Sequence, residues 1–141
     1  MPDFQRIKLV CLLSLLSIFV VSAVARNGRM QILPKGTWGG PHIRIIVDGK
    51  SATVEYDCAH GTIEGPFSID GDGKFNFTGK HVRERGGPVR QGKAQDSYPA
   101  QYNGWTDGKR MTLAVTLIKP NEDLGTFELT HGDEGRLWKC K

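Results

Sequence analysis

The segment Asp57-Cys58-Ala59-His60-Gly61 places a cysteine two residues before a histidine, two residue types that together can carry out nucleophilic catalysis. A nucleophilic cysteine needs a free thiol and a base within hydrogen-bond reach. The N-terminus described below predicts export, and in an exported domain with one other cysteine a disulfide is the simpler use of Cys58. We therefore interpret Cys58 as the partner of Cys140 and assign no catalytic residue.

Histidines are the other candidates for chemistry, and the chain has four: His42, His60, His81 and His131. No two are spaced i, i+2 or i, i+4, the spacings that place two imidazoles on one metal ion. We therefore expect no metal and no other cofactor. His81 follows Phe75 and Phe77 in an alternating pattern, so it is expected to point into the mouth of a barrel.

Residues 80–93 form a basic stretch in which Glu84 is the only acidic side chain, and its basic residues are Lys80, Arg83, Arg85, Arg90 and Lys93. Gly86-Gly87-Pro88 predicts a loop, and loops on a rigid scaffold commonly carry recognition. The candidate binding residues at this rim are His81, Arg83, Arg85 and Arg90. The alternative is a solvated loop whose charges keep the protein soluble.

The first 25 residues are typical of a secretory signal peptide. Arg6 and Lys8 precede an apolar run over residues 9–21, and Ala23 and Ala25 supply the small residues of a cleavage site. The run is too short for a membrane span. We expect residues 26–141 to be secreted or periplasmic, and an uncleaved N-terminal anchor is the alternative.

The net charge of the whole chain is +4. This value is only mildly basic, so it does not indicate a nucleic-acid partner. With the signal removed, we expect no membrane association either. These properties are compatible with two kinds of partner, a small apolar ligand or a secreted protein.

From Thr37 onward, alternating apolar and polar residues recur about every ten residues between Gly and Asp-Gly turns. Eight strands are predicted: one headed by Gly36-Thr37-Trp38 and running through 42–47, then 51–58, 62–69, 75–79, 100–106, 110–118, 125–130 and 135–140. Residues 26–35 are read as an N-terminal arm, and 36–141 as the β domain. An up-and-down meander closes most simply into an antiparallel barrel, because closure removes both edges. An open two-sheet sandwich is the alternative.

The cysteine positions favour closure. In a closed meander the second and eighth strands flank the first and run in the same direction. Cys58 ends the second predicted strand and Cys140 ends the eighth, so both are expected at one rim. A disulfide closing a loop of roughly 80 residues is expected to contribute on the order of 4 kcal/mol.

Gly36-Thr37-Trp38 resembles the Gly-x-Trp opening of the calycin barrels, lipocalins and avidins especially. The resemblance covers strand count, strand order and this motif. It implies that Trp38 closes one end of the barrel and that Lys139, late in the last strand, lies over its ring. The chain lacks the Thr-Asp-Tyr turn and the helix after the barrel that are typical of lipocalins. It also resembles short secreted proteins without an assigned function that open Gly-Thr-Trp-Gly-Gly and carry Asp-Cys-Ala-His-Gly.

Large side chains dominate the predicted interior, which indicates a largely filled barrel with a shallow pocket at its mouth. We therefore predict a non-enzymatic binding module for a small apolar ligand or for a macromolecule at the rim. The alternative is an inhibitor of a secreted protease that acts through the arm at 26–35. An enzyme is the least supported class, because no acid–base pair, triad or metal set can be assembled.

Overall fold

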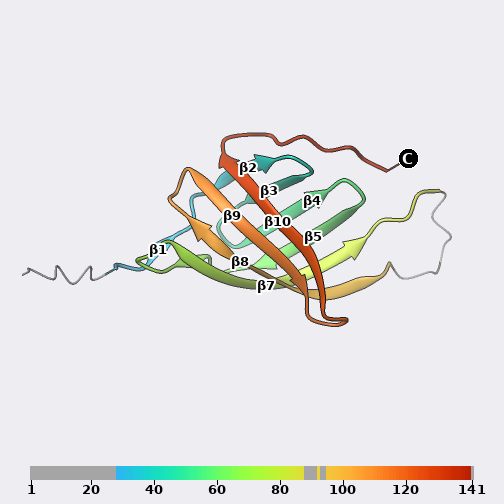
Figure 1. The fold of residues 1–141 in the computed structure, drawn as a ribbon, viewed down its shortest axis with the longest axis horizontal. Helices are drawn as coiled ribbons and strands as arrows, with labels where there is room; N and C mark the ends of the chain where they lie inside the picture. The colour runs from blue at the N-terminus through green and yellow to red at the C-terminus, as the bar shows by residue number, and fades with distance from the viewer. Residues whose placement is uncertain (1–27, 88–91, 93–94, 141) are drawn as a thin grey trace, which may run out of the picture.

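The structure is a computed structural model that describes residues 28–87, 92 and 95–140. In this part of the chain eight strands form a closed antiparallel barrel (Figure 1), in which each strand pairs with the next and β10 returns to β2. The barrel strands are β2 (Gly36–Gly40), β3 (Ile43–Val47), β4 (Ser51–Tyr56), β5 (Ala59–Glu64), β7 (Lys74–Arg83), β8 (Ser97–Thr106), β9 (Arg110–Leu117) and β10 (Glu122–His131). The predicted fold class is confirmed.

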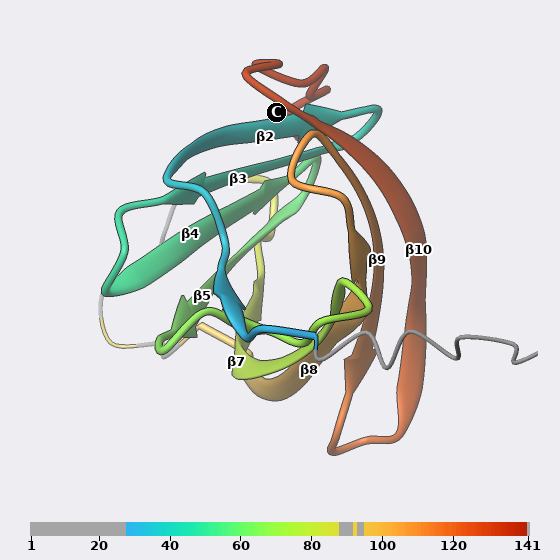
Figure 2. The same cartoon turned by 90° about the vertical axis from the view of Figure 1, so that its left-hand side faces the viewer.

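A small second sheet lies at the end of the barrel where the N-terminal arm enters (Figure 2). It pairs β1 (Gln31–Ile32) with β6 (Ser68–Ile69) in antiparallel register. The Leu33 N–H donates to the Phe67 carbonyl oxygen at 2.9 Å, and both side chains are buried. The described part of the arm, residues 28–35, is therefore packed against the barrel and helps to fill this end.

The number of barrel strands is as predicted, but the first predicted strand is two strands. β2 and β3 are joined at Pro41-His42, because Pro41 fixes its own φ and His42 adopts a positive φ of 65°. The third predicted strand, 62–69, is also divided. Pro66 interrupts it, so β5 stays in the barrel and β6 pairs with the arm.

The eighth predicted strand, 135–140, is not part of the barrel. Gly132 and Gly135 have φ values of 84° and 70°, which turn the chain out of the extended conformation after β10. One isolated parallel bridge, between Pro41 and Arg136, links this segment to a neighbour. The eighth barrel strand is instead β10, which contains the seventh predicted strand, 125–130.

Residues 132–140 form a segment, here called the strap, that crosses β2 and runs toward the turn between β4 and β5 (Figure 1). The Gly132 N–H donates to the Thr37 carbonyl oxygen at 2.7 Å, and the Arg136 N–H donates to the Gly40 carbonyl oxygen at 3.0 Å. These bonds take up backbone acceptors on β2 that the short pairing with β10 leaves open. The strap therefore extends the pairing of β2.

Gly39 allows the strap to lie close to β2. A Cβ atom at position 39 would overlap the Gly135 nitrogen and the Asp133 carbonyl oxygen. Because these are backbone atoms, they cannot move aside as a flexible side chain could. The absence of a side chain at Gly39 is thus a condition for the strap's path.

The strap ends in the disulfide between Cys140 and Cys58, which joins it to the β4–β5 turn. The two Cα atoms are 5.2 Å apart, within the usual range for a disulfide. The predicted pairing is confirmed, but the route differs from the prediction, because Cys140 arrives on the strap and not on a flanking barrel strand.

Large apolar side chains fill the barrel interior, as predicted. Residues from every barrel strand contribute to one continuous core, and its largest fully buried side chains are Trp38, Ile43, Val54, Phe67, Tyr102, Met111, Leu113, Val115, Leu117 and Leu129. A core packed in this way leaves the two ends of the barrel as the places where interior side chains can meet a ligand.

Replacing both cysteines by serine (Cys58→Ser with Cys140→Ser) is expected to lower the free energy of unfolding by about 2–5 kcal/mol, because the bridge spans 82 residues. Urea denaturation followed by circular dichroism measures this value. A reducing agent should destabilise the wild type and leave the double variant unchanged. Equal stability of the oxidised wild type and the double variant would contradict a stabilising role of the bridge.

Candidate functional site

An open cavity of about 590 Å³ lies at the end of the barrel opposite the β1–β6 sheet. Its walls come from the β2–β3 and β4–β5 turns, the C-terminal end of β7 and the start of β10. The strand β7 runs on to Arg83, beyond the predicted end at residue 79. This extension continues the alternation Phe75, Phe77, Gly79 and brings both His81 and Arg83 to the cavity.

Aromatic side chains form the floor of the cavity. The ring of Tyr56 lies 5.1 Å from that of His81, edge to face, and 5.8 Å from that of Phe127. His81 is only 4% exposed, which places it in the barrel mouth as the alternation predicted. Leu124 and Ala59 complete the apolar part of the lining.

Two polar atoms of the floor residues, the Tyr56 hydroxyl and His81 Nδ1, are enclosed by protein and meet no partner at full hydrogen-bond geometry among the described residues, although Tyr56 interacts with the neighbouring Tyr102 hydroxyl. A buried polar group without a partner costs about 1–3 kcal/mol. Tyr102, deeper in the barrel, shows the contrast, since its hydroxyl donates to the Lys80 carbonyl oxygen at 3.0 Å. Because both atoms are enclosed, the floor presents ring surface to the cavity.

Both of these floor residues are held in their neutral forms. Burial raises the pKa of Tyr56 well above its ordinary value, and the neighbouring Tyr102 adds to the effect. Burial also lowers the pKa of His81, and the nearby Arg83 guanidinium lowers it further. At neutral pH the floor of the cavity is therefore uncharged.

At the rim, Arg83 is already engaged. Its Nη2 donates to both carboxylate oxygens of Glu122, at 2.7 and 2.6 Å, and its guanidinium lies 5.2 Å from the centre of the Tyr98 ring. Arg85 pairs with Asp96. The arginines expected to form a cationic rim are thus neutralised where the structure describes them.

Arg90, the remaining predicted rim residue, lies outside the described residues.

Asp57 anchors the end of the strap at the rim. Its Oδ1 accepts from the Trp138 N–H at 2.8 Å, its Oδ2 contacts His42 Nδ1 at 2.6 Å, and its carbonyl oxygen accepts from the Cys140 N–H at 3.2 Å. The Trp138 N–H, and then His42, lower the pKa of Asp57. A second rim pair joins His60 Nδ1 to Glu84 at 2.9 Å.

The implied contact of Lys139 with Trp38 is wrong. The strap carries Lys139 to the mouth, where its Nζ donates to the Tyr56 carbonyl oxygen at 3.0 Å. The ring that packs against Trp38 is that of His131, at 4.8 Å. Trp38 is fully buried, and its Nε1 donates to the Pro34 carbonyl oxygen on the arm at 3.2 Å.

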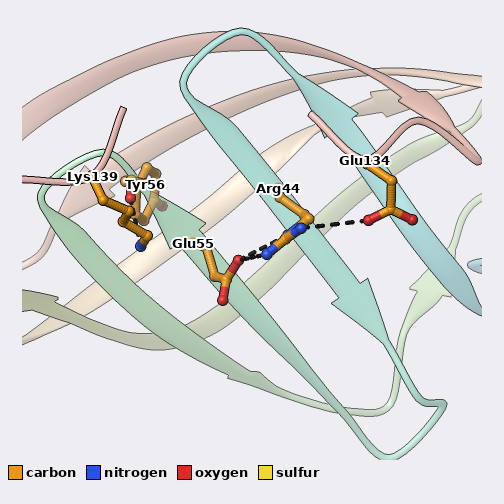
Figure 3. A network of polar contacts seen from close by, with 5 residues as sticks. All are labelled: Arg44, Glu55, Tyr56, Glu134 and Lys139. Atoms are coloured by element: carbon orange, nitrogen blue, oxygen red, sulfur yellow. Dashed lines mark hydrogen bonds and ion pairs between the residues drawn. The ribbon is translucent and has the colours of Figure 1, made fainter. Parts of the chain in front are cut away.

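A further ion-pair network fastens the start of the strap to the outside of the barrel (Figure 3). Arg44 on β3 pairs with Glu55 on β4 through Nε, at 2.8 Å, and through Nη2. Its Nη1 reaches Glu134 on the strap at 3.4 Å. The strap is therefore held at Glu134, at Asp57 and at the disulfide.

Sequence reasoning missed several members of the site. No sequence pattern marks Tyr56 and Phe127 as the floor of the mouth. Glu122 lies 39 residues from Arg83 in the sequence, so no local pattern links these two side chains. The sequence signal for charge at this rim is the excess of basic residues in 80–93. It predicts a positive rim, whereas the described cavity lining carries more carboxylates than guanidinium groups.

No protein-family model matches this chain, and neither does any curated protein or solved structure. The closed eight-stranded antiparallel barrel is compatible with a calycin-like fold. The disulfide is consistent with an extracytoplasmic location.

In the described part of the chain no helix is long and apolar enough to cross a membrane. The same residues contain no group of three or more His, Cys, Asp or Glu side chains placed to hold a metal ion.

Asp57→Asn is expected to destabilise the protein in a pH-dependent way. Since folding lowers the pKa of Asp57 below its ordinary value of 3.8, its contribution is fully present above that value and is lost as the pH falls through the folded pKa. The difference in free energy of unfolding from wild type should be on the order of 1 kcal/mol at pH 7 and should shrink toward pH 3.

Urea denaturation from pH 7 to pH 3 measures this difference. Asp72→Asn is the matched control, because Asp72 is an exposed carboxylate near the other end of the barrel. A difference that stays constant over the whole pH range would show that Asp57 does not act through its charge.

Proposed function

We propose that this protein is a secreted or periplasmic, non-enzymatic binding module that holds a small, largely apolar ligand in the cavity at the barrel mouth. The observation that carries the proposal is the cavity itself, whose floor is formed by the rings of Tyr56, His81 and Phe127. A concave site with an apolar floor and placed polar groups is typical of small-molecule binding.

The size and lining of the cavity support this proposal. Its volume of about 590 Å³ is in the range of small-molecule sites, which are mostly apolar with a few placed polar groups. The closed eight-stranded meander and the buried Trp38 at the head of β2 also support assignment to the calycin type. In that type, the mouth of the barrel is where an apolar ligand is expected.

We propose no catalysis. The rim carboxylates of Asp57, Glu84 and Glu122 are engaged in pairs with His42, His60 and Arg83. A general base or a nucleophile needs a group that is free to exchange a proton or attack a substrate. In the described lining, the only sulfur atoms belong to the disulfide.

The protease-inhibitor alternative has weaker support. Met30 and Ile32 on the arm are 69% and 63% exposed, as side chains offered to a partner would be. The backbone of the arm, however, is already paired through β1 and β6, and Leu33 is buried. A free inserting arm would need this pairing to open. Recognition of a macromolecule by the rim arginines is weakened in the same way, because Arg83 and Arg85 are paired.

A neutral apolar dye, Nile red, tests the proposal. Leu124→Trp adds a large side chain inside the cavity, and it should weaken dye binding about tenfold or more, measured by fluorescence titration. Thr126→Trp is the matched control, because position 126 lies on the same strand and is exposed. It should bind the dye as the wild type does. Equal binding by all three proteins would place the dye elsewhere and overturn the proposal.

A further inference from the structure

The charge of the mouth is opposite in sign to that of the chain. The charged side chains lining the cavity are three carboxylates, Asp57, Glu84 and Glu122, and one guanidinium, Arg83. With histidines counted as neutral, the described lining has a formal charge of −2, and Lys139, beside the Tyr56 carbonyl oxygen, would bring it to −1. The whole chain carries +4. A cation is therefore drawn to the mouth, and an anion is repelled.

The floor of the cavity suits a cation at short range. The Tyr56 ring lies 5.1 Å from the His81 ring and 5.8 Å from the Phe127 ring. An aromatic face attracts an ammonium group that lies within about 6 Å of the ring centre. The His81 and Tyr56 side chains are both neutral, so neither repels a cation at the floor.

Arg83, the guanidinium in the described cavity lining, is not free to hold an anion. Both oxygens of Glu122 bind Arg83, and the Tyr98 ring packs against its guanidinium. An anionic ligand would have to compete with Glu122 for Arg83 and would lie near two further carboxylates. The rim therefore disfavours anionic ligands. The electrostatic field of its carboxylates attracts a cation instead.

From these features we infer that the ligand is an organic ammonium: a protonated amine on a small apolar body. This inference rests on the proposed function. The ammonium group lies among the rings of Tyr56, His81 and Phe127, and the apolar body packs against Leu124.

Three probes of similar shape test the inference: 2-phenylethylamine, 2-phenylethanol and 3-phenylpropanoate. Each is titrated into the ¹⁵N-labelled protein at pH 7, and dissociation constants are taken from the chemical shifts of the mouth residues. The amine should bind about tenfold more tightly than the alcohol, and the carboxylate should bind most weakly.

Two substitutions assign the preference to the mouth. Glu122→Gln removes a carboxylate and releases Arg83, so it should weaken amine binding about tenfold and strengthen carboxylate binding. Glu128→Gln is the matched control on the same strand, because Glu128 bonds to Thr112 and does not line this cavity. It should leave all three constants unchanged.

The outcomes separate the two proposals. Tighter binding of the alcohol or the carboxylate at the mouth would overturn the ammonium inference and leave the binding module standing. The same effect of Glu122→Gln and Glu128→Gln would also overturn it, because the preference would then reflect overall charge. If none of the three probes shifts the mouth residues, both proposals fall.

Discussion

The closure of the barrel depends on a short seam. β10 and β2 pair through two residue pairs, Thr130 with Gly39 and His131 with Trp38, whereas β7 and β8 pair through nine. The strap continues directly from β10, crosses β2 through backbone hydrogen bonds and ends in a disulfide on the β4–β5 turn. It therefore holds the two sides of the seam together, and the closed barrel depends on this attachment.

The strap that secures the seam also shapes the mouth. Asp57 and Cys58, which hold its end, line the cavity, and Lys139 binds the backbone of Tyr56 in the floor. The floor is thus fixed by contacts that exist before any ligand arrives. Preorganisation of this kind would lower the ordering cost of the binding that we propose for this cavity.

The sequence predicted the parts of this structure that depend on local pattern. Alternation placed His81 in the mouth, Asp-Gly turns separated the strands, and two cysteines in an expected exported domain implied their pairing. The strap was not predictable in this way, because its path depends on the missing side chain at Gly39 and on positive φ at Gly135. Nor was the charge of the rim, since Glu122 neutralises Arg83 only after folding brings them together.

Native mass spectrometry of the protein, purified gently from its own host, tests the central claim most directly. The binding proposal predicts a companion of small mass that is lost on denaturation, and the ammonium inference predicts that it contains a basic nitrogen. An acidic companion would contradict the ligand class. A protein whose mass shows no bound ligand, either as purified or after incubation with an apolar amine, would contradict the claim that the mouth of this barrel is a ligand site.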